Sequence, residues 1–194
     1  MENQKRKSIR LKNYDYSLPC GYYITICTQD RACRFGDVID GQMVLNDVGE
    51  IVNKWWLKIP QRFPNTNLDG YQIMPNHLHG IIVIHDHFPH RRGNSRGRPM
   101  TKTGGDKPQT GGDKPRPYRL GDIVGSFKSL TINEYIRGVK NHGWPRFRNR
   151  IWQRNYYENI IRSKNDLQKI RRYIQNNPQM WDRDKNNPKN WKKS

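Results

Sequence analysis

The segment MPNHLHGIIVI, residues 74–84, is the most informative part of this chain. The apolar, β-branched run that ends it predicts a buried strand. Side chains alternate between the two faces of a strand, so His77 and His79 should share one face while Leu78 takes the other. Two imidazoles at this spacing can form half of a divalent metal site. The alternative is a pair of half-exposed strand histidines that bind nothing.

The segments around this stretch alternate between strand and helix patterns. Strands are predicted over residues 21–29, 35–45 (with a hairpin turn at Asp40-Gly41), 68–74, 77–85 and 151–161. Helices are predicted from Asn46 or Asp47 to a stop at Pro60, over residues 120–138, and from Ser163 to Asn177-Pro178. This order indicates an α+β fold, with a mostly antiparallel sheet and helices on one face, on a ferredoxin-like or RRM-like plan.

Composition divides the chain into parts. Residues 88–117 are rich in Gly, Pro, Lys and Arg and contain an imperfect TGGDKP repeat, which is typical of a flexible basic insert or linker. We expect a basic arm over residues 1–17, a single folded domain over 18–180 that this insert interrupts, and a basic, frayed tail over 181–194 on which Trp181 and Trp191 could dock.

The charge of the chain indicates its partner. Lys and Arg number 36 against 17 Asp and Glu, so the net charge is +19, which favours a polyanion, nucleic acid first and a membrane surface second. No run is long enough for a spanning helix, and the first residues lack the apolar stretch of a secretion signal. We therefore expect no membrane partner and a cytoplasmic, nucleoid-associated location in a bacterium. Cys20, Cys27 and Cys33 are expected to be reduced thiols.

The last predicted helix carries a candidate nucleophile. At 100° per residue, Leu167, Ile170 and Ile174 form its buried stripe. Tyr173 and Asn177 lie next to each other on the flank of that stripe. The alternatives are a core-edge tyrosine with a hydrogen-bonded hydroxyl and an asparagine that caps the helix.

Three segments in order, MPNHLHGIIVI, IWQRNYYENIIR and IRRYIQNNP, resemble the single-tyrosine HUH transposases, and the last two closely resemble the REP-associated tyrosine transposases. The resemblance covers about residues 18–180 without the insert. It implies the HUH endonuclease fold and metal-dependent cleavage and rejoining of single-stranded DNA hairpins through a covalent 5′-phosphotyrosine, that is, DNA transposition. It also implies a monomer or a homodimer.

The resemblance assigns roles to single residues. Tyr173 matches the nucleophile, His77 and His79 match the paired metal-binding histidines, and Asn177 matches the polar residue that completes the metal site, where some relatives carry Gln. The implied ion is Mg²⁺ or Mn²⁺. Such an ion polarises a phosphate oxygen, and Mn²⁺ accepts imidazole more readily than Mg²⁺ does.

Other residues could contact DNA or compete for these roles. Lys128, Gln153 and Arg154 are candidate DNA contacts. Tyr156 and Tyr157 are rival nucleophiles, although packing in a strand is the interpretation that we favour for both. A second pair, His85 and His87, lies roughly 20 Å from the first along a straight strand and cannot share its ion. The competing functions are a catalytically inactive nucleic-acid-binding protein on the same fold and an unrelated RNA-associated protein with an RRM-like sheet.

Overall fold

The computed structural model describes residues 14–86 and 118–191. The predicted insert at 88–117 and most of the predicted basic arm lie outside the described residues, as does His87. The strands are β1 (Cys20–Cys27), β2 (Gly36–Ile39), β3 (Gln42–Leu45), β4 (Thr66–Met74), β5 (His77–Ile84) and β6 (Tyr157–Ile161). The helices are α1 (Asp47–Leu57), α2 (Ile59–Arg62), α3 (Leu120–Asn141) and α4 (Lys164–Asn176), with 3₁₀ turns η1 (Gln29–Arg31), η2 (Pro178–Arg183) and η3 (Pro188–Asn190).

Four strands form one antiparallel sheet in the order β4-β5-β1-β6. The helix α1 connects β1 to β4, and β5 returns between them to pair with β1. This split β-α-β arrangement, repeated through α3 and β6, is the ferredoxin-like plan. The predicted α+β class, the antiparallel sheet and the ferredoxin-like plan are therefore confirmed.

The two faces of the sheet carry different side chains. Tyr22, Ile24 and Ile26 of β1 are fully buried, as are Leu78 and Ile82 of β5, and all five belong to the main hydrophobic core. Alternation along each strand sends the intervening residues to the opposite face. In β5, Leu78 and Ile82 therefore lie on the apolar face of the sheet, and His77 and His79 lie on the opposite face.

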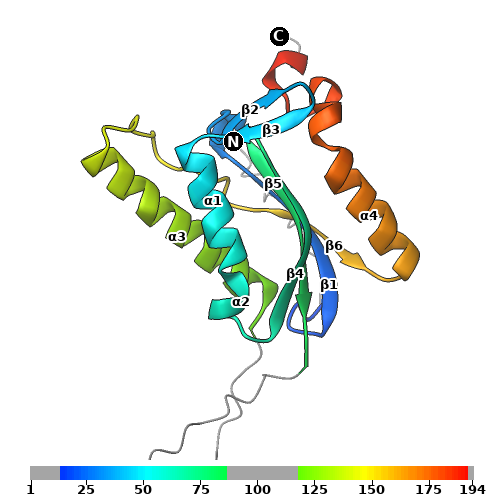
Figure 1. The fold of residues 1–194 in the computed structure, drawn as a ribbon. Helices are drawn as coiled ribbons and strands as arrows, with labels where there is room; N and C mark the ends of the chain where they lie inside the picture. Colours follow the sequence, from blue (N-terminus) through cyan, green and yellow to red (C-terminus); the bar gives the residue numbers. More distant parts are fainter. Residues whose placement is uncertain (1–13, 87–117, 192–194) are drawn as a thin grey trace, which may run out of the picture.

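Helices α1 and α3 cover the apolar face (Figure 1). Asn46 caps α1 by accepting the backbone N–H of Gly49 at 3.0 Å. Trp56 of α1 is fully buried and packs directly on the sheet over Gly80. A Cβ atom at Gly80 would lie 2.3 Å from the indole ring, so glycine at this position permits the close approach.

Helix α4 lies on the other face of the sheet (Figure 1), so the expectation of helices on one face only is wrong. Ser163 caps α4 as predicted, accepting the N–H of Asp166 at 3.0 Å. Arg171 fixes the helix to the edge strand β4 through two bonds to the carboxylate of Asp69, at 2.8 and 2.6 Å. These contacts hold the helix that carries Tyr173 against the histidine face.

Several boundaries differ from the predictions. The hairpin β2–β3 turns through Asp40 and Gly41, both with positive φ, as predicted. Pro60 does not simply stop a helix, because α1 ends at Leu57 and Pro60 enters the short helix α2. The strand predicted over 151–161 begins only at Tyr157, because the residues before it form a loop in which Trp152 is bridged to Thr28, just beyond β1.

The expected frayed tail is folded through residue 191. Trp181 of η2 is 9% exposed, and its ring lies 6.0 Å from that of His77. The side chain of Asn187 donates to the carbonyl of Trp181 at 3.0 Å and accepts the N–H of Lys189 at 3.0 Å. The tail is therefore part of the structure around the histidine face. Within the described residues, no helix combines the length and the apolar character needed to cross a bilayer.

A candidate metal centre beside an exposed tyrosine

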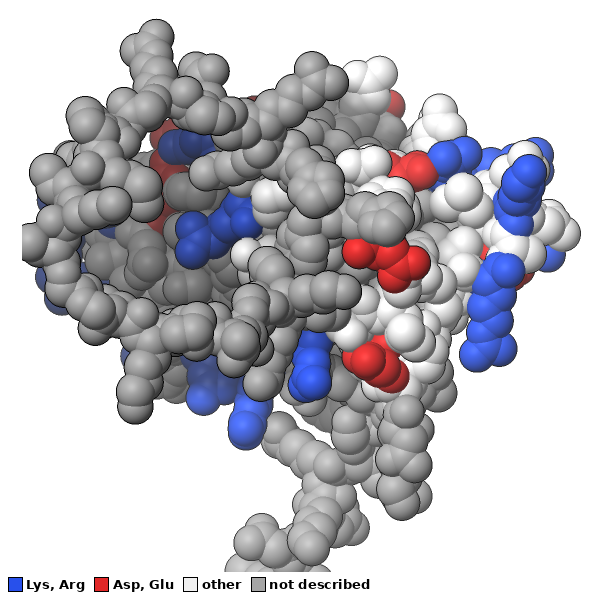
Figure 2. Space-filling view, turned by 90° about the horizontal axis from the view of Figure 1, so that it is seen from below, with Lys and Arg blue, Asp and Glu red and all other residues white. Residues whose placement is uncertain are grey.

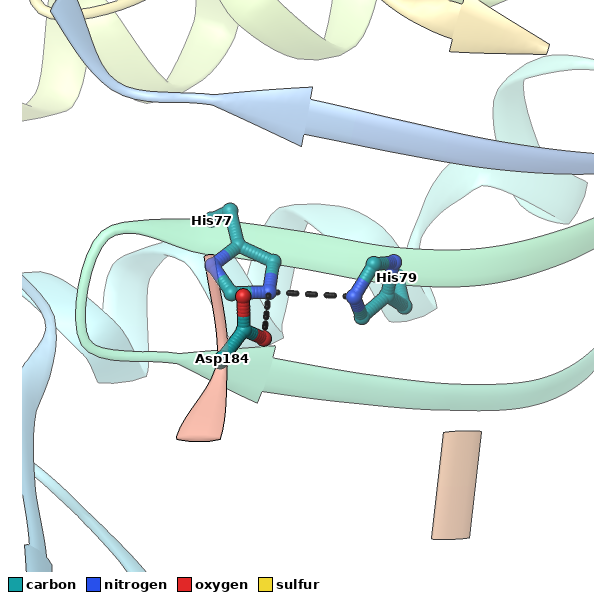
Figure 3. Close-up of side chains that lie close together, drawn as sticks. All are labelled: His77, His79 and Asp184. Carbon is teal, nitrogen blue, oxygen red and sulfur yellow. Dashed lines mark hydrogen bonds and ion pairs between the residues drawn. The ribbon is translucent and has the colours of Figure 1, made fainter. Parts of the chain in front are cut away.

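The two histidines are buried at the start of β5. His77 is fully buried and His79 is 2% exposed, so the alternative of half-exposed histidines is wrong. In the register of the sheet, Cys27 lies opposite His77 and Thr25 lies opposite His79. The predicted shared face is confirmed, because the two imidazole rings point toward each other from one strand (Figure 3).

A carboxylate from the tail completes a compact group of ligand atoms. The Nε2 atoms of His77 and His79 are 3.0 Å apart, and Oδ2 of Asp184 lies 3.8 Å from Nε2 of His77 (Figure 3). One ligand atom from each residue lies within 4.8 Å of the others. Asp184 was not predicted. The available signal was that Asp182 and Asp184 are carboxylates in an otherwise basic tail.

Asn76 determines which nitrogen of His77 carries the proton. The fully buried Asn76 amide donates to the carbonyls of Arg31 at 2.8 Å and Asn186 at 2.7 Å. Its oxygen therefore faces Nδ1 of His77, at 2.8 Å, and can only accept. Nδ1 of His77 is thus the protonated nitrogen, and Nε2 presents a free lone pair to the group.

The second ring is held by two hydroxyls. Nδ1 of His79 lies 2.7 Å from the Tyr23 hydroxyl and 2.9 Å from that of Thr25. Because Nε2 of His77 has no proton, the 3.0 Å contact between the rings is made by Nε2–H of His79. A hydroxyl can donate or accept, so Tyr23 and Thr25 also suit the opposite tautomer, in which Nε2 of His79 ligates an ion.

Burial keeps both imidazoles neutral. Burial, together with the positive charges of Arg31 and Lys185, lowers the pKa of His77 to about 3. Burial and the neighbouring His77 lower the pKa of His79 well below 6.5, against a smaller opposing effect of Asp184. Neutral imidazole is the form that binds a metal ion, so both rings are ready to ligate at neutral pH.

The donor set fits a small divalent cation. An octahedral ion with bonds of about 2.1 Å places neighbouring ligand atoms about 3.0 Å apart, which matches the two Nε2 atoms at 3.0 Å. Two imidazoles and one carboxylate are a donor set that divalent metal ions accept. His77, His79 and Asp184 are therefore the residues that could hold such an ion.

Asn177 remains a further candidate ligand. It is 3% exposed, and its side-chain oxygen accepts no hydrogen bond within the described residues. Its backbone N–H donates to the carbonyl of Ile174, so it also caps α4 as the alternative interpretation states. Its part in metal binding stays a prediction.

Tyr173 lies next to the histidines and is half exposed. Its ring is edge-on to His79, with centroids 5.3 Å apart, and edge-on to Tyr23 at 6.3 Å. Half of its side chain is open to solvent. Tyr173 and His79 line one cavity of about 560 Å³, to which Lys169 and Lys185 also contribute. The cavity brings one tyrosine and two lysines to the edge of the candidate metal centre.

The other predicted contacts lie beside this cavity. Lys128 directs its ammonium to the carbonyls of Gln153 at 2.9 Å, Arg154 at 3.5 Å and Asn155 at 3.1 Å, which gives it a structural part in holding this loop. The side chains of Gln153 and Arg154 line an adjoining open cavity. Their contacts with DNA stay predictions.

The rival residues are divided by their exposure. Packing is confirmed for Tyr156, which is 7% exposed, and is wrong for Tyr157, which is 52% exposed and lines the same cavity as Tyr173.

His85 is exposed just beyond β5. The three cysteines are free thiols, as predicted, although Cys33 is exposed in a loop.

Fold and site together define an α+β protein with a ferredoxin-like sheet and a candidate metal centre of two histidines and one carboxylate. A Haemophilus influenzae protein, described as uncharacterized, is 41% identical over 182 residues, covering 92% of this chain and 91% of that protein. The chain belongs to the same family as that protein. No protein-family model matches the chain.

Two solved structures were also found to be similar. One is a REP-associated tyrosine transposase bound to a REP hairpin, with 15% identity and a TM-score of 0.49 over 87% of this chain and 72% of that chain. The other is a candidate transposase from Deinococcus radiodurans, with 14% identity and a TM-score of 0.44 over 86% of this chain and 95% of that chain.

Proposed function

We propose that this protein is a metal-dependent transposase that cleaves and rejoins single-stranded DNA at hairpin-forming sequences through Tyr173. The observation that carries the proposal is the 5.3 Å edge-on approach of the Tyr173 ring to His79, one of two buried imidazoles with ligand atoms 3.0 Å apart. The ordered motifs quoted above, which resemble those of single-tyrosine HUH transposases, support the same assignment. The domain of residues 18–180 would include the HUH fold.

The residues present can perform a phosphoryl transfer. The phenolic oxygen of Tyr173 attacks the phosphorus, forming a Tyr–O–P bond while the bond from phosphorus to the 3′ oxygen breaks. The phenolic proton leaves to solvent, and the departing 3′ oxygen takes up a proton to become a hydroxyl. The covalent link keeps the energy of the phosphodiester, so a 3′-hydroxyl can reverse the step without ATP.

The surrounding groups supply binding and charge. His77, His79 and Asp184 would hold Mg²⁺ or Mn²⁺, and such an ion supplies polarisation of a phosphate oxygen. Lys169 and Lys185 line the cavity of Tyr173, where ammonium charge offsets that of the phosphate and of a developing phenolate. Because Tyr173 and both histidines meet within one chain, a monomer suffices for this chemistry. We place the activity in the cytoplasm of a bacterium, at the nucleoid.

The test is covalent capture of a labelled DNA hairpin. The protein is incubated with a fluorescent single-stranded hairpin and Mn²⁺, and a denaturing gel is examined for a protein–DNA band whose attachment site is mapped by mass spectrometry. We expect an adduct on Tyr173 that is absent from Tyr173→Phe. Tyr157→Phe is the matched control, since Tyr157 is exposed in the same cavity, and it should keep the adduct. An adduct that persists in Tyr173→Phe would reject Tyr173 as the nucleophile.

The second candidate is a nucleic-acid-binding protein without catalysis. The open cavity that contains Gln153 and Arg154 favours it, because four arginines line that cavity and binding there needs no nucleophile. Tight hairpin binding with no adduct in the presence of Mn²⁺ would support this candidate over the enzyme.

A further inference from the structure

Arg31 of η1 lies where two cavities meet. It lines the cavity of Tyr173 and also the larger open cavity of about 1440 Å³ beside it. Its Nη1 donates to the carbonyl of Lys185 at 3.1 Å, and its Cζ lies 5.6 Å from the centre of the Trp191 ring. Lys185 lines the first cavity and Trp191 lines the second. The guanidinium is therefore held at the junction of the two cavities.

The backbone at Arg31 is strained. Asp30 and Arg31 have φ angles of 55° and 48°, in the left-handed region that residues with a Cβ atom rarely adopt. Two hydrogen bonds hold this turn, because the Arg31 N–H donates to the carbonyl of Thr28 at 3.2 Å and the Arg31 carbonyl accepts from the Asn76 amide at 2.8 Å. Strained backbone of this kind concentrates at functional sites. The strain therefore points to a use for the direction that the turn gives Arg31.

One buried amide connects Arg31 with the candidate metal centre. The Asn76 side chain that donates to the Arg31 carbonyl also accepts from Nδ1 of His77, at 2.8 Å. Asn76 is fully buried and has no room to turn away from either partner. The backbone of Arg31 and the imidazole of His77 are thus fixed relative to each other.

The charge of Arg31 acts at the edge of this centre. Burial lowers the pKa of His77 to about 3, and the positive charge of Arg31 contributes to that shift. Burial raises the pKa of the Cys27 thiol, which lines the cavity of Tyr173, and the same charge opposes this effect. Coulomb energy falls with distance. The guanidinium is therefore close enough for its charge to be felt inside the cavity of Tyr173.

The guanidinium has hydrogen-bonding capacity left for an anion. Arginine carries five N–H donors, and the bond to Lys185 is the one that the guanidinium makes among the described residues. No carboxylate of the described part of the chain forms an ion pair with Arg31. The neighbouring Asp30 accepts from the Gln29 amide instead, at 2.8 Å. A partly buried guanidinium with free donors matches the two oxygens of a phosphate.

We propose that Arg31 binds the phosphate that Tyr173 attacks and stabilises the transition state of its transfer. Two N–H groups of Arg31 donate to the non-bridging oxygens while the Tyr–O–P bond forms and the bond from phosphorus to the 3′ oxygen breaks. Arg31 keeps its proton throughout, and no bond to it forms or breaks. This inference rests on the proposed function and adds to it a catalytic residue from η1.

The test separates the rate of the chemical step from the affinity for DNA. Adduct formation on a fluorescent single-stranded hairpin with Mn²⁺ is timed on denaturing gels at saturating DNA. Hairpin affinity is measured by anisotropy in the Tyr173→Phe background, where nothing is cleaved. We expect Arg31→Ala to slow adduct formation about 100-fold or more and to weaken hairpin binding less than about threefold. A parental rate at saturating DNA, whatever the affinity, would overturn the inference.

The reverse reaction gives a readout that a role in binding alone would not move. A group that stabilises the transition state lowers the barrier equally in both directions. Rejoining is measured by adding a strand with a 3′-hydroxyl to the isolated adduct. Arg31→Ala should slow rejoining by the same factor as cleavage, so that the proportion of adduct at equilibrium stays the same. Slower cleavage with a parental rate of rejoining would reject Arg31 as a catalytic residue.

The affinity for Mn²⁺ shows whether Arg31 acts through the candidate metal centre. Alanine keeps the backbone carbonyl that accepts from Asn76. Arg31→Ala should therefore not weaken Mn²⁺ binding in a calorimetric titration without DNA. A Kd that rises about tenfold or more would assign the lost rate to the metal site, since losses of that size follow from disturbed support of a ligand, and the inference would then be wrong.

Lysine at the same position tests the need for the planar fork. Arg31→Lys keeps the charge and most of the aliphatic stem, but it cannot donate to two phosphate oxygens in the same way. We expect a rate about tenfold below that of the parent and above that of Arg31→Ala. If the alanine variant does not fold, the lysine variant decides, and a parental rate in it would count against Arg31.

The matched control removes an arginine from the other end of the sheet. The turn η1 follows the end of β1 that pairs with the start of β5, whereas α2 precedes the start of β4, which pairs with the end of β5. Figure 2 looks at the molecule from the α2 end, where described cations and carboxylates are both present. Arg62 is exposed on α2. Arg62→Ala should keep the parental rate, and equal slowing in both alanine variants would trace the effect to net charge and reject the inference.

Failure of this inference is distinguishable from failure of the proposed function. An adduct in the parent protein together with a parental rate in Arg31→Ala leaves Tyr173 as the nucleophile and rejects Arg31. The lack of any adduct in the parent protein rejects the proposed function, and the role of Arg31 falls with it.

Discussion

The amide oxygen of Asn76 lies 2.8 Å from Nδ1 of His77, and the amide nitrogen of the same side chain donates to two backbone carbonyls. The orientation of the amide is therefore set by the backbone around it. One tautomer of His77 follows, with its free lone pair on Nε2, directed toward His79 and Asp184. Residue 76 thus acts through residue 77, as a positioning residue for the candidate metal centre.

Replacing Asn76 should weaken metal binding only where the new side chain can no longer accept the hydrogen bond from Nδ1–H of His77. Asn76→Ala removes the acceptor of Nδ1–H, so we expect the Kd for Mn²⁺ to rise about 10–100-fold. Asn76→Asp loses the same amide donor and keeps an acceptor, so it should retain most of the affinity. Calorimetric titration with Mn²⁺ measures both, and thermal melting without metal reports the stability cost that the two variants share. Equal Mn²⁺ affinities of Asn76→Ala and the parent would show that Asn76 does not position His77 for metal binding.

Removing the carboxylate of Asp184 should weaken the same site. The Asp184 side chain is 8% exposed and lies 3.8 Å from Nε2 of His77. An amide is a weaker, uncharged ligand, so Asp184→Asn should raise the Kd for Mn²⁺ at least about tenfold. Asp182→Asn, an exposed neighbour in the same tail, should leave it unchanged. If instead Asn177→Ala abolishes Mn²⁺ binding and Asp184→Asn does not, then Asn177 at the end of α4 supplies the third protein ligand, and the assignment of Asp184 is wrong.

The ion pair between Arg171 and Asp69 should control how often Tyr173 is in position. It fixes α4 to β4 by two hydrogen bonds, two residues before Tyr173, and it lowers the pKa of the Asp69 carboxyl. We expect Arg171→Ala to slow adduct formation several-fold while Mn²⁺ affinity stays unchanged, because neither histidine lies on α4. Arg172→Ala, which removes the adjacent exposed arginine, serves as the control. Parallel losses in both variants would indicate lost DNA attraction instead of lost positioning.

The buried His77 should make the metal-free protein less stable in acid. Its pKa is about 3 in the folded chain against 6.5 ordinarily, so between these values the unfolded chain binds a proton that the folded chain does not. Stability therefore falls as the pH drops from 6.5 toward 3, by up to about 1.4 kcal/mol per pH unit, and above 6.5 this group contributes no pH dependence.

Urea unfolding at a series of pH values, with chelator present, tests this expectation. The variant His77→Asn has no titrating ring at this position, so its stability should fall less steeply below pH 6.5 than that of the parent. Two curves that stay parallel from pH 7 to pH 5 would contradict neutral burial of His77.

A methyl group at Gly80 should disturb the contact between α1 and the sheet. The added Cβ would lie 2.3 Å from the fully buried Trp56 ring, so Gly80→Ala should lower the free energy of unfolding by about 1–3 kcal/mol. Gly125→Ala is the matched control in α3, where a Cβ atom would meet no heavy atom within 4 Å. It should raise stability by about 0.5–1 kcal/mol through helix propensity. Thermal and urea unfolding measure the stability of both variants. Equal stability of the two would show that Trp56 does not pack closely against position 80.

Local patterns were sufficient for much of the fold. The strand β5, the caps at Asn46 and Ser163 and the shared face of His77 and His79 all depend on residues close together in the chain. Periodicity and capping act over a few residues, and a sequence displays them directly. The same reasoning failed over 151–161, where the aromatic and β-branched residues fill the core from a loop and only the last five form a strand.

The α+β class, the buried strand with two histidines on one face and the amphipathic helix that carries Tyr173 all follow from local sequence patterns. The packing of distant segments was needed to learn that α4 covers the histidine face and that Asp184 returns from the tail to His77. It was also needed to learn that Tyr157 is exposed in a cavity that four arginines line. Alternation specifies a face within one element, whereas the meeting of side chains from distant elements depends on how those elements pack against one another.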